Sequence, residues 1–87
     1  MLRIRRTKGR AVVMTVSGRL DAENVSQLCR LIDAEPVGEV LVLDLRDLVL
    51  ADREVVRRLR EFESRERITL RNCPAFIRRW MAGEDVP

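Results

Sequence analysis

The sequence contains no histidine and no tyrosine, and its aromatic side chains are two phenylalanines and one tryptophan. Histidine is the commonest general base in enzymes and a frequent zinc ligand, so sites that depend on it are excluded. The four glycines are scattered along the chain, so the sequence has no glycine-rich phosphate-binding loop. Because aromatic side chains are so scarce, we expect a core of leucine, valine and isoleucine.

Cysteine is also rare. Cys29 and Cys73 are far apart in the sequence and belong to no CxxC pair, so we expect reduced, structural thiols and a cytoplasmic location. The alternative makes Cys73 a nucleophile at the start of a helix, where the dipole lowers a thiol pKa. No base lies near Cys73 in the sequence, so we favour the structural role.

Long hydrophobic segments are absent as well. The first residues are charged and lack the apolar stretch of a signal peptide. The longest apolar runs, Val40–Leu43 and Leu48–Ala51, are much shorter than the roughly 20 residues that cross a bilayer. We therefore expect no membrane span.

Charged residues make up 36% of the 87 residues, and the net charge is +3. No acid precedes Asp21, whereas the same segment carries Arg3, Arg5, Arg6, Lys8, Arg10 and Arg19. A basic hairpin can attract nucleic acid or an anionic surface, and a small binding domain of that kind is one alternative function. A charged edge strand that resists aggregation is the interpretation we favour, because the aromatics that stack on bases are scarce. We expect no nucleic-acid partner.

Hydrophobic periodicity predicts a β-hairpin. In its first strand, residues 2–5 alternate between apolar and basic side chains, and residues 11–16 form an inner strand that ends at Ser17-Gly18. Asp21 is the expected N-cap of a first helix. The apolar stripe of this helix comprises Val25, Leu28, Leu31 and Ile32. Residues 39–45 are almost continuously apolar, so we expect a central parallel strand that is covered on both faces.

Asp52 is the expected N-cap of a second helix. The buried face of this helix comprises Val55, Val56, Leu59 and Phe62. Its exposed face offers two ion pairs at i, i+4 spacing, Glu54 with Arg58 and Glu61 with Arg65. Residues 68–70 form a short strand, and Pro74 is expected at the first position of a last helix that ends at Gly83. The buried face of the last helix comprises Phe76, Ile77, Trp80 and Met81.

These elements predict an α/β fold of order ββαβαβα, with a four-stranded mixed sheet packed against about three helices. A chain of this length forms one domain. We expect that domain to span residues 1–83, and residues 84–87 to form a frayed C-terminal tail.

One cluster of acids could carry chemistry, because Asp44 ends a central strand and Asp47 and Asp52 follow it. Three carboxylates there could hold Mg²⁺, which is the basis of an enzymatic alternative. In the interpretation we favour, Asp44 and Asp47 bond loop amides and Asp52 caps the helix. We therefore expect no catalytic residue, no metal and no cofactor.

Three segments resemble a known family. The run from Val40 to Asp52 is similar to the STAS domain, whose apolar strand ends in Asp-Leu before a short apolar turn and an Asp-Ser-Ser-Gly helix start. Residues 16–21 resemble the family's Gly-x-Leu-Asp exit from the second strand, and residues 68–74 resemble its last strand and the turn after it. The resemblance spans nearly the whole chain in the correct order.

The resemblance implies a binding module rather than an enzyme. STAS domains include bacterial anti-sigma factor antagonists, which bind an anti-sigma factor that is also a serine kinase. Phosphorylation at the start of the second helix breaks that complex. Other members belong to signalling assemblies, lipid-transport ABC complexes or anion transporters. A protein partner in bacterial signalling or regulation of transcription is thus implied, and an accessory subunit of a lipid-transport complex is an alternative.

The sequence departs from the family at the phosphorylation motif. Asp52 matches the family aspartate, but Arg53 and Glu54 stand at the two serine positions and Val55 replaces the glycine. Glu54 occupies the phosphoacceptor position, so we predict no phosphorylation site. A carboxylate at a helix start resembles a phosphoserine in sign, although we favour an ordinary first-turn glutamate paired with Arg58.

The expected protein-binding surface joins the start of the second helix to the exit of the second strand. It comprises Gly18, Arg19, Asp21, Asp52, Arg53, Glu54 and Arg57. The sequence leaves the identity of the partner open, and it also leaves open a homodimer built by pairing of edge strands.

Overall fold

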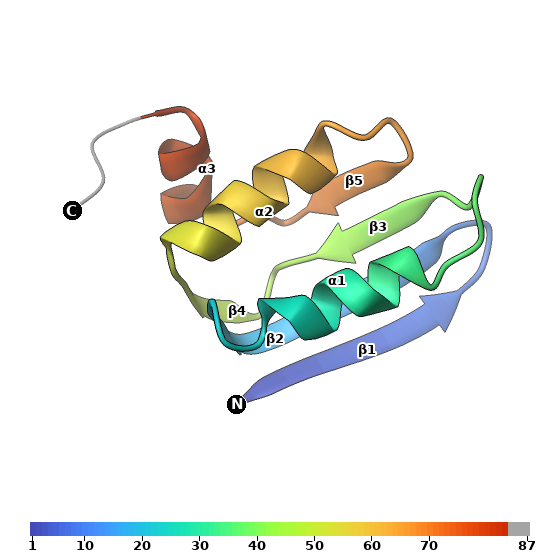
Figure 1. Ribbon diagram of the computed structural model, residues 1–87, viewed down its shortest axis with the longest axis horizontal. Coiled ribbons are helices and arrows are strands. Elements are labelled where there is room, and N and C mark those ends of the chain that lie inside the picture. Colours follow the sequence, from blue (N-terminus) through green and yellow to red (C-terminus); the bar gives the residue numbers. More distant parts are fainter. Residues whose placement is uncertain (84–87) are drawn as a thin grey trace.

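The computed structural model describes residues 1–83, so the predicted C-terminal tail lies outside the described residues. A hairpin of β1 (Leu2–Lys8) and β2 (Val12–Leu20) leads into helix α1 (Val25–Asp33). Strands β3 (Leu41–Asp44) and β4 (Leu48–Ala51) then precede helix α2 (Arg53–Glu63). Strand β5 (Ile68–Arg71) and helix α3 (Ala75–Met81) complete the order (Figure 1).

The strands form one mixed sheet in the order β1-β2-β3-β5, with β4 paired to β2 outside this path. The pair β1–β2 is antiparallel, and the pairs β2–β3, β2–β4 and β3–β5 are parallel. The predicted α/β class, mixed sheet and three helices are confirmed. The fifth strand, β4, was expected to be a short apolar turn, and that expectation is wrong.

The end of β2 also differs from the prediction. The strand continues past Ser17-Gly18 to Leu20, because β3 pairs only with Val12–Thr15 and β4 provides a new partner for Gly18–Leu20. A register shift between Gly18 and Arg19 separates the two pairings. One long strand thus pairs with two short parallel strands in succession, first with β3 and then with β4.

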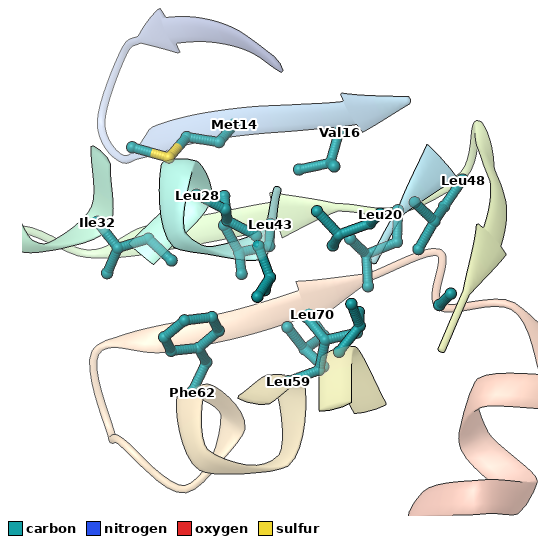
Figure 2. Close-up of a cluster of buried hydrophobic side chains, with 14 of the residues drawn as sticks. Met14, Val16, Leu20, Leu28, Ile32, Leu43, Leu48, Leu59, Phe62 and Leu70 are labelled. Atoms are coloured by element: carbon teal, nitrogen blue, oxygen red, sulfur yellow. The ribbon is translucent and has the colours of Figure 1, made fainter. Parts of the chain in front are cut away.

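Helices α1 and α2 lie side by side over one face of the sheet (Figure 1). The strand residues that face these helices are buried and alternate with less buried neighbours. The buried strand residues are Val12, Met14, Val16, Leu41, Leu43, Ile68 and Leu70. Figure 2 shows Leu28 and Ile32 of α1 and Leu59 and Phe62 of α2 around Leu43 and Leu70. Burying this apolar area is the main stabilising contribution to the fold.

The prediction that β3 is covered on both faces is correct only in part. Leu41 and Leu43 are buried under the helices, whereas on the opposite face Asp44 is buried and Val42 is partly exposed. The predicted stripe of α1 is correct for Val25, Leu28 and Ile32 but not for Leu31, which is exposed. A continuous apolar run therefore indicated more burial than a sheet with helices on one face provides.

The last helix is less buried than the sequence indicated. Ile77 is fully buried, but Phe76, Trp80 and Met81 are only partly covered. Phe76 and Trp80 meet edge to face, with ring centroids 6.4 Å apart. Pro74 is the N-cap rather than the first helical residue, and Gly83 follows the helix with φ +82, as a helix-terminating glycine does. Within residues 1–83, no helix combines the length and the hydrophobicity that crossing a membrane requires.

Candidate protein-interaction site

The structure brings together the two segments that the sequence predicted to share a surface. Strand β4 pairs with the end of β2, so that Leu20 lies opposite Ala51. The Gly18 amide donates to the Asp47 carbonyl at 3.1 Å. The exit of β2 and the start of α2 are consequently neighbours, although some thirty residues separate them in the sequence.

Asp52 ties the two segments together with its side chain. One carboxylate oxygen accepts from the Val55 amide at 3.0 Å, which is the N-cap bond of α2 that the sequence predicted. The other oxygen accepts from the Ala22 amide at 2.8 Å. A single carboxylate thus caps α2 and fixes the turn that leads into α1.

Asp21 acts in that turn, but it is not the N-cap of α1. The helix begins at Val25 with Asn24 in the capping position, so the predicted cap is wrong by three residues. Asp21 Oδ1 accepts from the Asn24 amide at 3.1 Å, and Asn24 Oδ1 accepts from the Asp21 amide at 2.8 Å. This reciprocal pair has the hydrogen-bond pattern of a capping box, and it closes one extra turn before the helix.

Gly18 has a conformation that only glycine adopts easily, with φ +90. A Cβ at this position would overlap the carbonyl oxygen of Met1. The same carbonyl accepts from the Arg19 amide at 3.3 Å. Glycine therefore allows the start of β1 to pass closely over the register shift in β2.

The exposed face of α2 carries charges that pair differently from the prediction. Glu54 binds Arg57, with its nearest contact at 2.6 Å, and lies farther from Arg58, at 3.7 Å. The hydrogen bond to Glu54 raises the pKa of Arg57 above its ordinary value. The Glu54 charge is therefore compensated within α2, as in the interpretation that we favoured, but Arg57 is the main partner.

The second predicted pair of α2 does not form. Glu61 contacts Arg57 at 3.4 Å and Arg58 at 3.7 Å. Arg65 instead lies 4.0 Å from Asp33 and stacks over the Phe62 ring, 5.6 Å from its centroid. Because Arg65 lies beyond the last residue of α2, regular i, i+4 spacing no longer applies there.

Two residues beside this surface were missed by the sequence reasoning. Val49 and Leu50 of β4 are 74% and 46% exposed, whereas Leu48 and Ala51 at the ends of the strand are buried. They come directly before Asp52, next to the start of α2. The signal in the sequence was an apolar run too short and too close to a loop to be wholly buried.

The three acids considered for a metal site are not brought together. Asp44 is buried and accepts from the Arg46 amide at 3.1 Å, from Asn72 Nδ2 at 3.2 Å and from Arg71 at 3.3 Å. Asp52 is occupied by two amides, and Asp47 meets β2 through its backbone carbonyl. Across residues 1–83 no group of three or more acidic or cysteine side chains could hold a metal ion. The three acids of the magnesium alternative therefore do not form one group of ligands among the described residues.

Both thiols are partly buried, and burial raises the pKa of Cys29 and of Cys73. Nearby arginines oppose the effect without cancelling it, Arg58 for Cys29 and Arg78 for Cys73. A raised pKa leaves less thiolate at neutral pH. The geometry thus favours the structural role over the nucleophilic alternative.

The basic hairpin is partly neutralised by the residues that follow α1. Arg6 makes two hydrogen bonds to Glu35, at 2.8 and 3.0 Å, and Lys8 lies 3.1 Å from Glu39. These pairs hold the hairpin against the connection between α1 and β3. Fewer cations then remain for a nucleic-acid or anionic-surface partner, which disfavours that alternative.

No family model matches the sequence, and no curated protein matches it either. The resemblance to STAS domains therefore depends on the three sequence motifs and on the residues that carry them.

Proposed function

We propose that this chain is a non-enzymatic protein-interaction domain of the STAS type, acting in bacterial signalling or regulation of transcription without a phosphorylation switch. The observation that carries the proposal is the contact between Asp52 and the Ala22 amide, at 2.8 Å. It joins the two segments that resemble STAS motifs into one surface. An accessory role in a lipid-transport complex would use the same surface.

The composition of this surface supports a protein partner. Arg19 and Arg53 are exposed and surround the start of α2, and Val49 and Leu50 add exposed apolar area beside them. Protein interfaces combine an apolar centre with a polar rim, and arginine is enriched in them. The start of α2 is also fixed by a side-chain cap, so little ordering cost is expected on binding.

The loss of the phosphoacceptor implies an interaction that phosphorylation at this position does not control. No serine, threonine or tyrosine occurs from Asp44 to Glu63, and Arg53 and Glu54 occupy the two serine positions. Arg57 compensates the Glu54 carboxylate. A phosphate carries a charge of about −1.5 to −2 at neutral pH, so a neutralised glutamate is a poor substitute for it. We therefore expect the domain to resemble an unphosphorylated antagonist, which is the form that binds.

The test is to isolate a stoichiometric partner from the native organism by affinity capture and then measure its dissociation constant by calorimetry. We expect the double variant Arg53→Glu, Arg57→Glu to weaken binding about tenfold or more, equivalent to about 1.4 kcal/mol. The matched control is Arg5→Glu, Arg10→Glu, which changes the net charge equally but lies on the hairpin. Failure to recover a stoichiometric partner, or equal affinity of the first variant and the wild type, would overturn the proposal.

A further inference from the structure

Helices α2 and α3 enclose a shallow trough that shares Arg53 and Arg57 with the predicted binding residues and extends beyond them. One hollow of about 280 Å³ is lined by Arg53, Val56, Arg57, Arg60 and Trp80. A second, of about 350 Å³, is lined by Arg60, Glu63, Ser64 and Met81. Because Arg60 lines both, the two hollows are neighbours. We call them together the α2–α3 trough.

The arginines of the trough are unequally paired. Arg57 is held by Glu54 and Glu61, at 2.6 and 3.4 Å. Arg53 and Arg60 form no ion pair with any acid of residues 1–83. Glu63, the acid that lines the second hollow, is bound to Arg78 at 2.8 Å. The lining of the trough therefore has an excess of positive charge that no acid of residues 1–83 compensates at Arg53 or Arg60.

The floor of the trough is apolar. Val56 is almost fully buried, and Trp80 is half-buried with its ring edge to face on Phe76. Met81 adds a flexible apolar side chain at the second hollow. Tryptophan and arginine are the residues most enriched among those that dominate the binding energy of protein interfaces.

The two adjoining hollows give the trough an elongated form along α2, which suits a peptide segment. The two hollows, of about 280 and 350 Å³, lie just below and just above the lower limit of small-molecule sites, which is about 300 Å³, and each is sufficient for a few side chains. Arg53, Arg57 and Arg60 follow i, i+4, i+7 spacing, so they share one face of α2. The 11 residues of α2 span roughly 16 Å, about three helical turns.

We propose that the α2–α3 trough binds an acidic amphipathic helix of a protein partner. The carboxylates of the partner helix would pair with Arg53 and Arg60. The apolar side chains of the partner helix would contact Val56 and Trp80. The inference rests on the proposed function, because Arg53 and Arg57 belong to both surfaces. It extends that function by assigning the chemistry of the partner and by adding Arg60 and Trp80.

The experiment uses the fluorescence of Trp80, which is the one tryptophan of the chain. The probe is a synthetic helical peptide of about 15 residues, long enough to form a helix, with leucines on one face and glutamates beside them. The control peptide carries lysine at every glutamate position. We expect the glutamate peptide to change the Trp80 fluorescence in a saturable way, with an affinity that falls as salt is added. The lysine peptide should cause no such change.

Variants locate the binding. We expect the double variant Arg53→Glu, Arg60→Glu to lower the affinity for the glutamate peptide about tenfold or more. The double variant Arg5→Glu, Arg10→Glu should change this affinity much less. Equal binding of the two peptides, or no loss in the first variant, would overturn the inference. Urea unfolding of each variant shows whether a loss reflects unfolding instead of lost contacts.

Two further results separate this inference from the proposed function. If the captured partner requires Arg53 and Arg57 but binds normally to Arg60→Glu and Trp80→Leu, the trough is not its site and only this inference fails. If no partner is captured while the glutamate peptide binds the trough, the proposed function fails by itself.

Residues 84–87 include Glu84 and Asp85, so a chain that ends at Gly83 is tested as well. If the full chain binds no glutamate peptide and the shortened chain does, the chain's own C-terminal segment is the competitor and the partner assignment is overturned.

Discussion

The carboxylate of Asp52 accepts a hydrogen bond from the amide of Ala22 at 2.8 Å, across 30 residues of sequence. Its other oxygen caps α2 through the Val55 amide. The starts of α1 and α2 are therefore coupled through one side chain. This side chain adds to the pairing of β2 with β4 in holding the two segments together.

Replacing Asp52 separates the two roles of its carboxylate. Asp52→Ala removes the N-cap, and we expect a loss of about 1–2 kcal/mol in the free energy of unfolding. Asp52→Ser can keep the bond to Val55 but has one side-chain oxygen, so we expect most of the stability to return. Urea unfolding measures both variants.

Hydrogen exchange then reports the coupling itself. Because Asp52→Ser leaves the Ala22 amide without its acceptor, we expect faster exchange at Ala22 in both variants but slow exchange at Val55 only in the serine variant. Unchanged exchange at Ala22 would show that the carboxylate does not couple the two helix starts.

Gly18 is predicted to be intolerant of any side chain. Its φ of +90 strains other residues, and a Cβ would overlap the Met1 carbonyl oxygen. We expect Gly18→Ala to lower the free energy of unfolding by about 1–3 kcal/mol. Gly9→Ala is the matched control, since a Cβ there meets no atom within 4 Å. Equal stability of the two variants in thermal unfolding would contradict this account.

Because of Asp44, we expect the free energy of unfolding of the protein to fall in acid. Burial raises the pKa of this carboxyl, but hydrogen bonds from the Arg46 amide, Asn72 and Arg71 outweigh burial and hold the pKa below its usual value. The folded state therefore binds the proton more weakly than the unfolded state, whose pKa is about 3.9. The stabilisation is complete above that pH and is lost as the pH falls through the lower, folded value.

The variant Asp44→Asn isolates this contribution. At neutral pH we expect it to be less stable than the wild type by about 1–3 kcal/mol, because a charged acceptor is lost from a buried site. The difference should shrink as the pH falls below about 4. Denaturant unfolding at several pH values measures it, and a difference that is constant with pH would rule out the carboxylate as the cause.

The two thiols are predicted to react slowly in the folded protein. Burial raises the pKa of Cys29 and Cys73, which lowers the thiolate fraction at neutral pH. We expect an aromatic disulfide reagent to modify both residues several-fold more slowly in buffer than in denaturing urea. A rapid reaction of Cys73 in the folded state would revive its nucleophilic alternative.

The ion pairs of the hairpin provide a test of the nucleic-acid alternative. Arg6 and Lys8 are engaged by Glu35 and Glu39, so we expect negligible binding to DNA, RNA or anionic vesicles even at low salt, where attraction is greatest. Glu35→Gln, Glu39→Gln frees both cations and should increase any such binding. Strong, salt-sensitive binding by the wild type, lost in Arg3→Glu, Arg5→Glu, would favour the alternative instead.

The sequence by itself determined most of the secondary structure. Alternation and helical spacing are local properties, so they predicted the hairpin and the buried faces of α1 and α2 apart from Leu31. The cap at Asp52 and the turn glycine at Gly83 were local signals of the same kind. The absence of a hydroxyl side chain at positions 53 and 54 was also evident from the sequence, because residue identity does not depend on the fold.

Tertiary structure decided what each element pairs with and which surfaces remain open. The sequence did not show that Leu48–Ala51 forms a strand, because its partner Gly18–Leu20 lies far away in the chain and pairing is a non-local property. It did not place Glu54 on Arg57, since several arginines lie within reach of one carboxylate and rotamers choose among them. The trough at Trp80 arises because α3 covers only part of α2, and no local periodicity reports where two helices leave space between them.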